Sequence, residues 1–126
     1  MLYEALDTSL LMIDLQDIVE QRLSGTADEG LVNTSEVMDD WGVITFYDGS
    51  GNVIRCEFIE TERSWKRRDA VQDYNDLISE GVEVLVIVPE SVLESVDNFL
   101  GIYAHPDVQL SSMDELGIMI HEIIPP

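Results

Sequence analysis

The stretch "VEVLVIVP" (residues 82–89) is an almost continuous run of branched apolar residues that ends at a proline. Such a run is typical of a strand buried on both faces of a sheet, because alternation with polar residues is lost when helices cover both sides. Segments with helical spacing lie on either side of it, at 65–81 and 91–101. The run therefore predicts the middle layer of an α/β (α+β) domain.

The remaining pattern supplies further elements. Residues 7–25 have the spacing of an amphipathic helix, with Asp7 or Thr8 as its cap. Residues 24–40 are polar and predict a loop with a short helical turn. The segments 41–47 and 52–60 flank "DGSG" and predict a hairpin, 107–110 predicts a short strand, and Ser112 with Glu115 forms a capping box that opens a last helix. We expect a three-layer domain in the order αββαβαβα, with helices on both faces of a mixed sheet.

Length and composition limit the classes of protein to consider. The 126 residues suit one domain spanning 1–126. No apolar run approaches the roughly 18 residues that a membrane span needs, so no membrane partner is expected. The acidic N-terminus is unlike an export signal, and the single cysteine, Cys56, cannot form an internal disulfide. These features favour a cytoplasmic protein.

Charge is distributed unevenly along the chain. The net charge is −20, with 26 acidic and six basic residues, and four of the six bases occupy "RSWKRR" (residues 63–68). The summed field should repel nucleic acid and anionic membranes and attract cations and basic partners. A salt-loving host would also favour such a surface, and the chain has a single lysine.

The hairpin places acidic residues near one another. If its turn is centred on Ser50, Asp40 lies opposite Glu60 on the inward face, with Glu62 two residues further along. Opposed like charges on a sheet are unfavourable, so the three carboxylates require a divalent cation, a shared proton or a basic side chain. Oxygen ligands suit Mg²⁺, Mn²⁺ or Ca²⁺. Asp40 and Glu60 are thus candidate ligands of Mg²⁺ or Mn²⁺.

This arrangement resembles the PD-(D/E)XK, or restriction-endonuclease-like, nucleases over about residues 36–100. Asp40 in "MDDW" matches the family's Asp, and Glu60 in "IETE" matches its Glu. The helix and buried strand of "DAVQDYNDLISEGVEVLVIVPES" follow in the family's order. The resemblance implies a metal-dependent nuclease whose carboxylates bind Mg²⁺ and position a water that attacks a phosphodiester.

Two departures from the family pattern affect the catalytic set. No proline precedes Asp40, and Glu62 stands where the family usually has lysine. Some members carry glutamate at that position, and others supply the lysine from the following helix, where Lys66 lies. The resemblance implies the catalytic set Asp40, Glu60, Glu62 and Lys66, or an inactive descendant of such an enzyme.

The basic cluster has two interpretations. With Ser64 as a helix cap, the bases lie near the positive end of the helix dipole, which disfavours them unless an anion compensates. A phosphate could be that anion, bound by Arg63, Trp65, Arg67 and Arg68. Alternatively, the bases pair internally with Glu60, Glu62 and Asp69, or with the acidic N-terminal helix.

Two functions therefore remain open from the sequence. The first is a restriction-endonuclease-like domain that acts on nucleic acid, or its inactive descendant. The second is an acidic, non-enzymatic interaction module, such as a DNA mimic or an accessory or immunity-type subunit with a basic protein partner. The state of Asp40, Glu60 and Glu62 separates the two. Oligomer formation is possible in either case.

Overall fold

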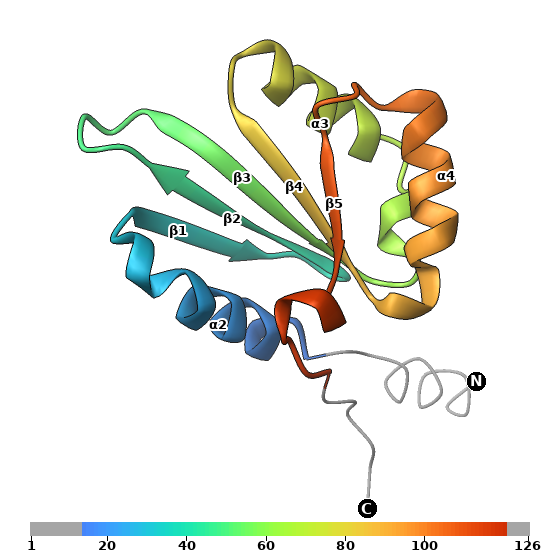
Figure 1. The fold of residues 1–126 in the computed structure, drawn as a ribbon, viewed down its shortest axis with the longest axis horizontal. Helices are drawn as coiled ribbons and strands as arrows, with labels where there is room; N and C mark the ends of the chain where they lie inside the picture. The colour runs from blue at the N-terminus through green and yellow to red at the C-terminus, as the bar shows by residue number, and fades with distance from the viewer. Residues whose placement is uncertain (1–13, 121–126) are drawn as a thin grey trace, which may run out of the picture.

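The computed structural model describes residues 14–120, and its centre is a five-stranded mixed sheet with helices on both faces (Figure 1). This confirms the α/β fold class. In chain order the helices and strands are α2 (Leu15–Thr26), β1 (Val32–Val37), β2 (Trp41–Tyr47), β3 (Val53–Glu60), α3 (Ala70–Ser79), β4 (Glu83–Val88), α4 (Leu93–Tyr103) and β5 (Gln109–Ser112). The predicted order lacked one strand, because β1 occupies part of the segment expected to be a loop.

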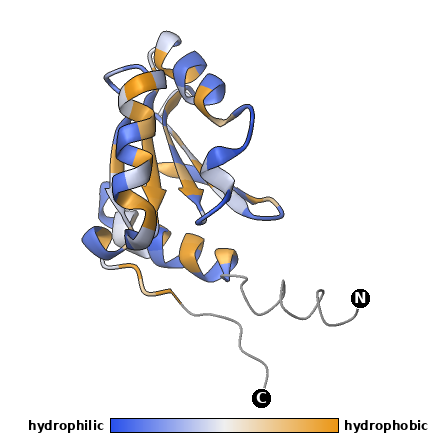
Figure 2. Ribbon diagram, turned by 90° about the vertical axis from the view of Figure 1, so that its right-hand side faces the viewer, coloured by the Kyte–Doolittle hydropathy of each residue, from blue (hydrophilic) through white to orange (hydrophobic). Residues whose placement is uncertain are grey.

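The strands lie in sequence order, β1-β2-β3-β4-β5. The first three are antiparallel neighbours, and β4 and β5 continue the sheet parallel to β3. The helix α3 connects β3 to β4, and α4 connects β4 to β5, so both crossovers are βαβ units. Figure 2 shows largely hydrophobic strands beside helices of mixed hydropathy, as this layered arrangement requires.

Two apolar cores lie on opposite faces of the sheet. On one face, α2 packs on β2, β3 and β4 through residues such as Ile18, Ile44 and Ile87. On the other face, α3 and α4 pack on β3 and β4 around Tyr74, Val86 and Val96. The strand β4 has side chains in both cores, which explains its continuous apolar sequence.

Gly42 of β2 lies close to the backbone of β1 and to α2. A Cβ atom added there would lie 3.6 Å from the Val19 side chain and 3.3 Å from the backbone oxygen of Glu36. The second distance is tighter than ordinary van der Waals contact. A side chain at this position would therefore require a small shift of the β1 backbone, whereas its Cβ atom would make an ordinary contact with Val19 of α2.

The predicted hairpin register is wrong by one residue. At the turn, Tyr47 does face Val53, as a loop centred on Ser50 requires. A β-bulge then leaves Ile54 without a partner, so Phe46 faces Arg55 and Trp41 faces Glu60. Asp40 is therefore not opposite Glu60.

The bulge also changes which residues share a face. Ile44 lies in the core beside α2, whereas Cys56 lies in the core beside α3 and α4. A turn centred on Ser50 would have placed these two residues opposite each other, whereas Ile44 is paired with Glu57. Burial raises the pKa of the Cys56 thiol, in keeping with a core residue that stays protonated.

Several predicted helix ends also differ from the structure. Asp14 caps α2 by accepting a hydrogen bond from the backbone N–H of Asp17, and the predicted caps Asp7 and Thr8 lie outside the described residues. Ser112 and Glu115 form the predicted reciprocal capping box, but only a 3₁₀ turn, Asp114–Leu116, follows it before Gly117 (φ 72°). The segment beyond residue 120 lies outside the described part.

Replacement of Ile18 by alanine tests the packing of α2. Ile18 is fully buried, so Ile18→Ala should lower the free energy of unfolding by about 2–5 kcal/mol through lost burial and a residual cavity. The matched control Glu20→Ala changes an exposed position of the same helix and should stay within about 0.5 kcal/mol of wild type. Urea denaturation measures both, and equal losses would contradict this packing.

Candidate functional site

Glu60, at the end of β3, is a fully buried carboxylate surrounded by donors. Its Oε1 accepts hydrogen bonds from Ser64 Oγ (2.7 Å) and from Arg67, and its Oε2 accepts one from the Tyr74 hydroxyl. The donors come from the 3₁₀ turn Ser64–Lys66, the connection after it and α3. Glu60 thus ties the end of β3 to the elements that follow it.

Arg67 supplies the positive charge of this cluster. Its guanidinium stacks on the ring of Trp41, with Cζ 3.7 Å from the ring centroid. Its Nη1 also donates to the backbone oxygen of Ser64, whereas Nη2 is buried without a hydrogen-bond acceptor among residues 14–120. The guanidinium is therefore positioned by Glu60, by Ser64 and by an aromatic face.

Tyr74 closes the cluster from α3. Its ring meets Phe58 edge to face, with centroids 4.8 Å apart, and the side chain is almost completely buried. Burial, together with the negative charge of Glu60, raises the pKa of Tyr74 well above its ordinary value. The phenol therefore remains a hydrogen-bond donor to the carboxylate.

The other predicted carboxylates are not in this cluster. Asp40 is exposed in the turn between β1 and β2, outside the paired residues of β2 and β3. Glu62 is exposed after β3, where its Oε1 accepts a hydrogen bond from Ser91 Oγ at 3.3 Å. The arrangement expected from the hairpin, with Asp40, Glu60 and Glu62 on one inward face, is therefore wrong.

This geometry bears on the predicted Mg²⁺ or Mn²⁺. Glu60 is fully buried, and Ser64, Arg67 and Tyr74 occupy three of the four lone-pair positions of its carboxylate, which leaves one position on Oε2. Within the described residues, no three His, Cys, Asp or Glu side chains are grouped so that they could hold an ion. The residues present do not form a ready donor set, and metal binding stays a prediction.

The basic cluster at 63–68 divides into two parts. Arg67 is the internal partner of Glu60, as one of the two interpretations expected. Arg63, Lys66 and Arg68 are exposed, and none of them has an ion pair to another described residue. Lys66 lies 5.2 Å from the centroid of the Trp65 ring.

Trp65 is a core residue. Its side chain is buried, its Nε1 donates to the backbone oxygen of Glu62, and its ring meets Phe99 of α4 edge to face. The ring is therefore not open for stacking on a ligand. Of the four predicted phosphate contacts, Arg63 and Arg68 are the two with exposed charges.

The helix start in this region is also later than predicted. The segment Ser64–Lys66 forms a 3₁₀ turn, and α3 begins only at Ala70, after Asp69. Ser64 uses its hydroxyl to bind Glu60 and to accept from the Thr61 backbone N–H, so it does not cap α3. The bases therefore precede α3 and do not occupy its first turn as predicted.

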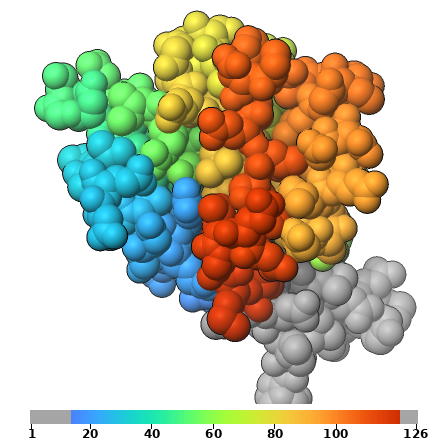
Figure 3. Space-filling model, viewed as in Figure 1, coloured from blue at the N-terminus to red at the C-terminus, as the bar shows by residue number. Residues whose placement is uncertain are grey.

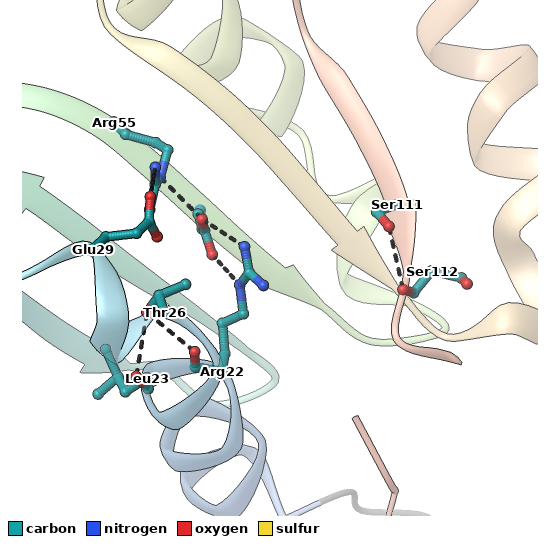
Figure 4. Close-up of polar contacts among 8 residues, drawn as sticks. Arg22, Leu23, Thr26, Glu29, Arg55, Ser111 and Ser112 are labelled. Atoms are coloured by element: carbon teal, nitrogen blue, oxygen red, sulfur yellow. Dashed lines mark hydrogen bonds and ion pairs between the residues drawn. The ribbon is translucent and has the colours of Figure 1, made fainter. Parts of the chain in front are cut away.

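A second buried carboxylate, Glu57, lies on the opposite face of β3. Arg22 of α2 binds it with two contacts, Nε to Oε1 at 2.6 Å and Nη2 to Oε2 at 3.0 Å. Arg55 contacts the same carboxylate through Nε at 3.0 Å and binds Glu29 through its two terminal nitrogens. Figure 4 shows Arg22 from the helix and Arg55 from the strand converging on this point.

The Glu57 network was not predicted from the sequence. Within this network, the hydrogen bond between Glu29 and Arg55 lowers the pKa of Glu29 and raises the pKa of Arg55. The available signal was the presence of Arg22 and Arg55 as the two bases outside 63–68 in so acidic a chain. Isolated cations of this kind are candidates for internal ion pairs.

Loss of the Arg67 side chain should strongly destabilise the fold. Arg67→Leu leaves Glu60 buried without its cation, and the expected loss is about 3–5 kcal/mol. The neighbouring exposed position supplies the control Arg68→Leu, with an expected change within about 0.5 kcal/mol. Adding Glu60→Gln to Arg67→Leu should recover part of the loss, since the amide carries no charge. Chemical denaturation of wild type, the two single variants and the double variant measures these free energies of unfolding. If Arg67→Leu and Arg68→Leu lowered the free energy of unfolding by similar amounts, the role of Arg67 would be refuted.

Tyr74 should make stability fall at alkaline pH. Because the pKa of Tyr74 is raised in the folded state, the unfolded chain releases the phenol proton at lower pH than the folded chain does. The contribution of Tyr74 to the free energy of unfolding is therefore full below the ordinary tyrosine pKa of about 10 and is lost as pH rises above that value. The unfolding free energy of Tyr74→Phe should lack this part of the pH dependence. Tyr103→Phe, at an exposed position of α4, should follow wild type. A Tyr74→Phe curve parallel to wild type would count against the assignment.

Searches against protein-family models, curated proteins and solved structures gave no match to this chain. No helix among residues 14–120 combines the length and apolar character needed to cross a bilayer. Interpretation of the site therefore depends on its own contacts and charges.

Proposed function

We propose that the chain is a non-catalytic, acidic domain that binds a basic surface of a partner protein. The observation that carries this proposal is that three of the six basic residues form ion pairs with acidic residues of the chain itself. Arg22, Arg55 and Arg67 are ion-paired to Glu57, Glu29 and Glu60, so half of the positive charge neutralises internal or neighbouring acids. Among residues 14–120, Arg63, Lys66 and Arg68 are the only Lys or Arg residues that are exposed, and the other exposed residues with a formal charge are Asp and Glu.

The engaged state of Glu60 favours a non-catalytic role. A carboxylate that binds metal or activates water must be open to a ligand, whereas Glu60 is fully buried and accepts hydrogen bonds from Ser64, Arg67 and Tyr74. Asp40, the second residue of the proposed pair, lies in an exposed turn. If the chain descends from the restriction-endonuclease-like proteins that its sequence resembles, we propose that it is an inactive descendant.

Electrostatics favour a basic protein over nucleic acid as the partner. The field of an acidic surface steers a positively charged partner toward it and repels polyanions, within a Debye length of about 10 Å at 0.1 M salt. Complementary charge contributes mainly to specificity and to the rate of association. A surface adapted only to high salt would show the same charge without a defined binding site.

A short peptide of alternating lysine and threonine should bind wild type with one-to-one stoichiometry and weaken as salt rises. The charge-reversed peptide of glutamate and threonine, and a single-stranded DNA oligonucleotide, should not bind. Isothermal titration calorimetry measures stoichiometry and affinity together. Binding that never saturates would indicate a diffuse charge effect and overturn the proposal.

A metal titration tests the nuclease alternative with a matched pair of variants. Asp39 and Asp40 are adjacent exposed residues of one turn, and only Asp40 belongs to the resemblance. Mn²⁺ should therefore titrate wild type, Asp39→Asn and Asp40→Asn alike, with the weak binding expected of an acidic surface. A saturable site lost only in Asp40→Asn, together with metal-dependent cleavage of DNA, would contradict the non-catalytic assignment.

A further inference from the structure

We propose that the outer edge of β1 binds an extended, basic segment of a partner protein as a sixth strand of the sheet. This inference rests on the proposed function, since it names the place and the form in which a basic partner binds. It is carried by three features of β1, which are its position at the sheet edge, the direction of its free backbone groups and the charge around it.

The first feature is the exposure of β1 at the edge of the sheet. The strand is the terminal member of the order β1-β2-β3-β4-β5, and all six of its residues are exposed. Val32 retains 69% of its surface and Val37 retains 38%. In Figure 3 the cyan segment, from the end of α2 to the start of β1, lies at the left of the molecule below the green hairpin that joins β2 and β3.

The second feature is the direction of the backbone groups. Met38 N–H donates to the Trp41 oxygen at 2.7 Å, which makes Met38 and Trp41 a hydrogen-bonded pair. In an antiparallel ladder these pairs alternate with non-bonded pairs, so Thr34 and Glu36 direct their backbone groups at β2. The N–H and C=O groups of Asn33, Ser35 and Val37 therefore point outward and can pair with an added strand.

Among residues 14–120, the edge of β1 has no proline, lysine or bulge to hinder pairing. Edge strands are commonly shielded by proline, lysine, a bulge or a covering element. The sequence "VNTSEV" has neither proline nor lysine, and its register with β2 is uninterrupted. The opposite edge strand, β5, has four residues and becomes buried toward its end, so it offers a shorter site.

The surface beside β1 is also open on one face of the sheet. Along β2, residues facing α2 are buried, whereas the alternate residues facing the other side are only half-buried. A shallow depression of about 250 Å³ lies there, lined by Thr34, Ser35, Glu36, Val43 and Thr45. Side chains of an added strand that point to this face would extend over β-branched and hydroxyl side chains.

The third feature is the negative charge around β1, which favours a basic segment as the added strand. Glu36 lies in β1, Asp39 and Asp40 lie in the turn after it, and Asp28 lies before it. No lysine or arginine occurs between Arg22 and Arg55. A second copy of the chain would bring two such acidic edges together, whereas lysine or arginine side chains on an added strand would complement them.

The decisive variant is Ser35→Pro, with Ser35→Ala as its matched control. Because the Ser35 N–H points outward, proline removes a donor from the edge without removing a bond to β2, and its ring blocks the approach of another strand. The alternating lysine–threonine peptide should bind Ser35→Pro about tenfold or more weakly than wild type, and bind Ser35→Ala with wild-type affinity. Circular dichroism and thermal unfolding verify that both variants fold.

Hydrogen exchange of wild type gives a second readout that needs no variant. With the peptide bound, the amides of Asn33, Ser35 and Val37 should gain protection, while those of Thr34 and Glu36 are protected already by β2. Protection gained elsewhere, or none at these three amides, would overturn the proposal. The proposal would also be overturned if these amides became protected when the protein concentration rises without peptide, because a second copy of the chain would then be the added strand.

A second peptide separates the failure of this inference from failure of the proposed function. A peptide that repeats Lys-Pro-Pro, with the same number of lysines, carries the same charge but has proline on both edges, so it cannot pair along a strand. If it binds as well as the lysine–threonine peptide, or if Ser35→Pro binds like Ser35→Ala, then strand addition is wrong and the basic-partner function stands. If neither peptide binds wild type with saturation, both proposals fail.

Discussion

The extra residue that β3 inserts at Ile54 determines which face of the sheet each later residue of that strand occupies. Because side chains alternate along a strand, a shift of one residue moves each side chain to the other face. With the bulge in place, Glu57 points toward α2 and Glu60 points toward α3. Both buried ion pairs depend on this one irregularity, since each carboxylate meets its arginine only on its own face.

Both ion pairs compensate the burial of a carboxylate, Glu57 on one face of β3 and Glu60 on the other. A buried carboxylate loses its hydration and must recover the lost free energy from charged or hydrogen-bonded partners. Arg22 does this for Glu57 with two contacts, and Arg67 does it for Glu60 while stacking on Trp41. Arginine suits both places, since its planar group combines several donors with a face that stacks on aromatic rings.

The sequence predicted the elements whose pattern is strong and local. The run at 82–89, the two connecting helices and the capping box of Ser112 and Glu115 each carry a signal within a few residues. The strand β1 was missed because both of its faces are exposed, so the apolar alternation that marks a half-buried strand is absent. The strand β1 forms because it pairs with β2, and this pairing leaves no pattern in the local sequence.

The candidate site was less predictable than the fold, and the reason is again the bulge. A hairpin register inferred from the centre of the turn is correct at Tyr47 and Val53 and fails one residue later. Glu60 was recognised as a residue needing a partner, and internal pairing with the 63–68 cluster was one of the alternatives considered. Glu57 was not singled out, since nothing in the local sequence shows that Arg22, 35 residues away, reaches it.

The acidic surface has a bearing on how copies of the molecule behave in crowded solution. An open strand edge is a template for aggregation, and sequences commonly interrupt such edges with lysine or proline. Here the carboxylates of Glu36, Asp39 and Asp40 border the edge, so two identical edges repel each other before their backbones can pair. Like charge at the rim therefore opposes the association of two copies and, unlike proline, leaves the outward backbone groups of β1 unobstructed.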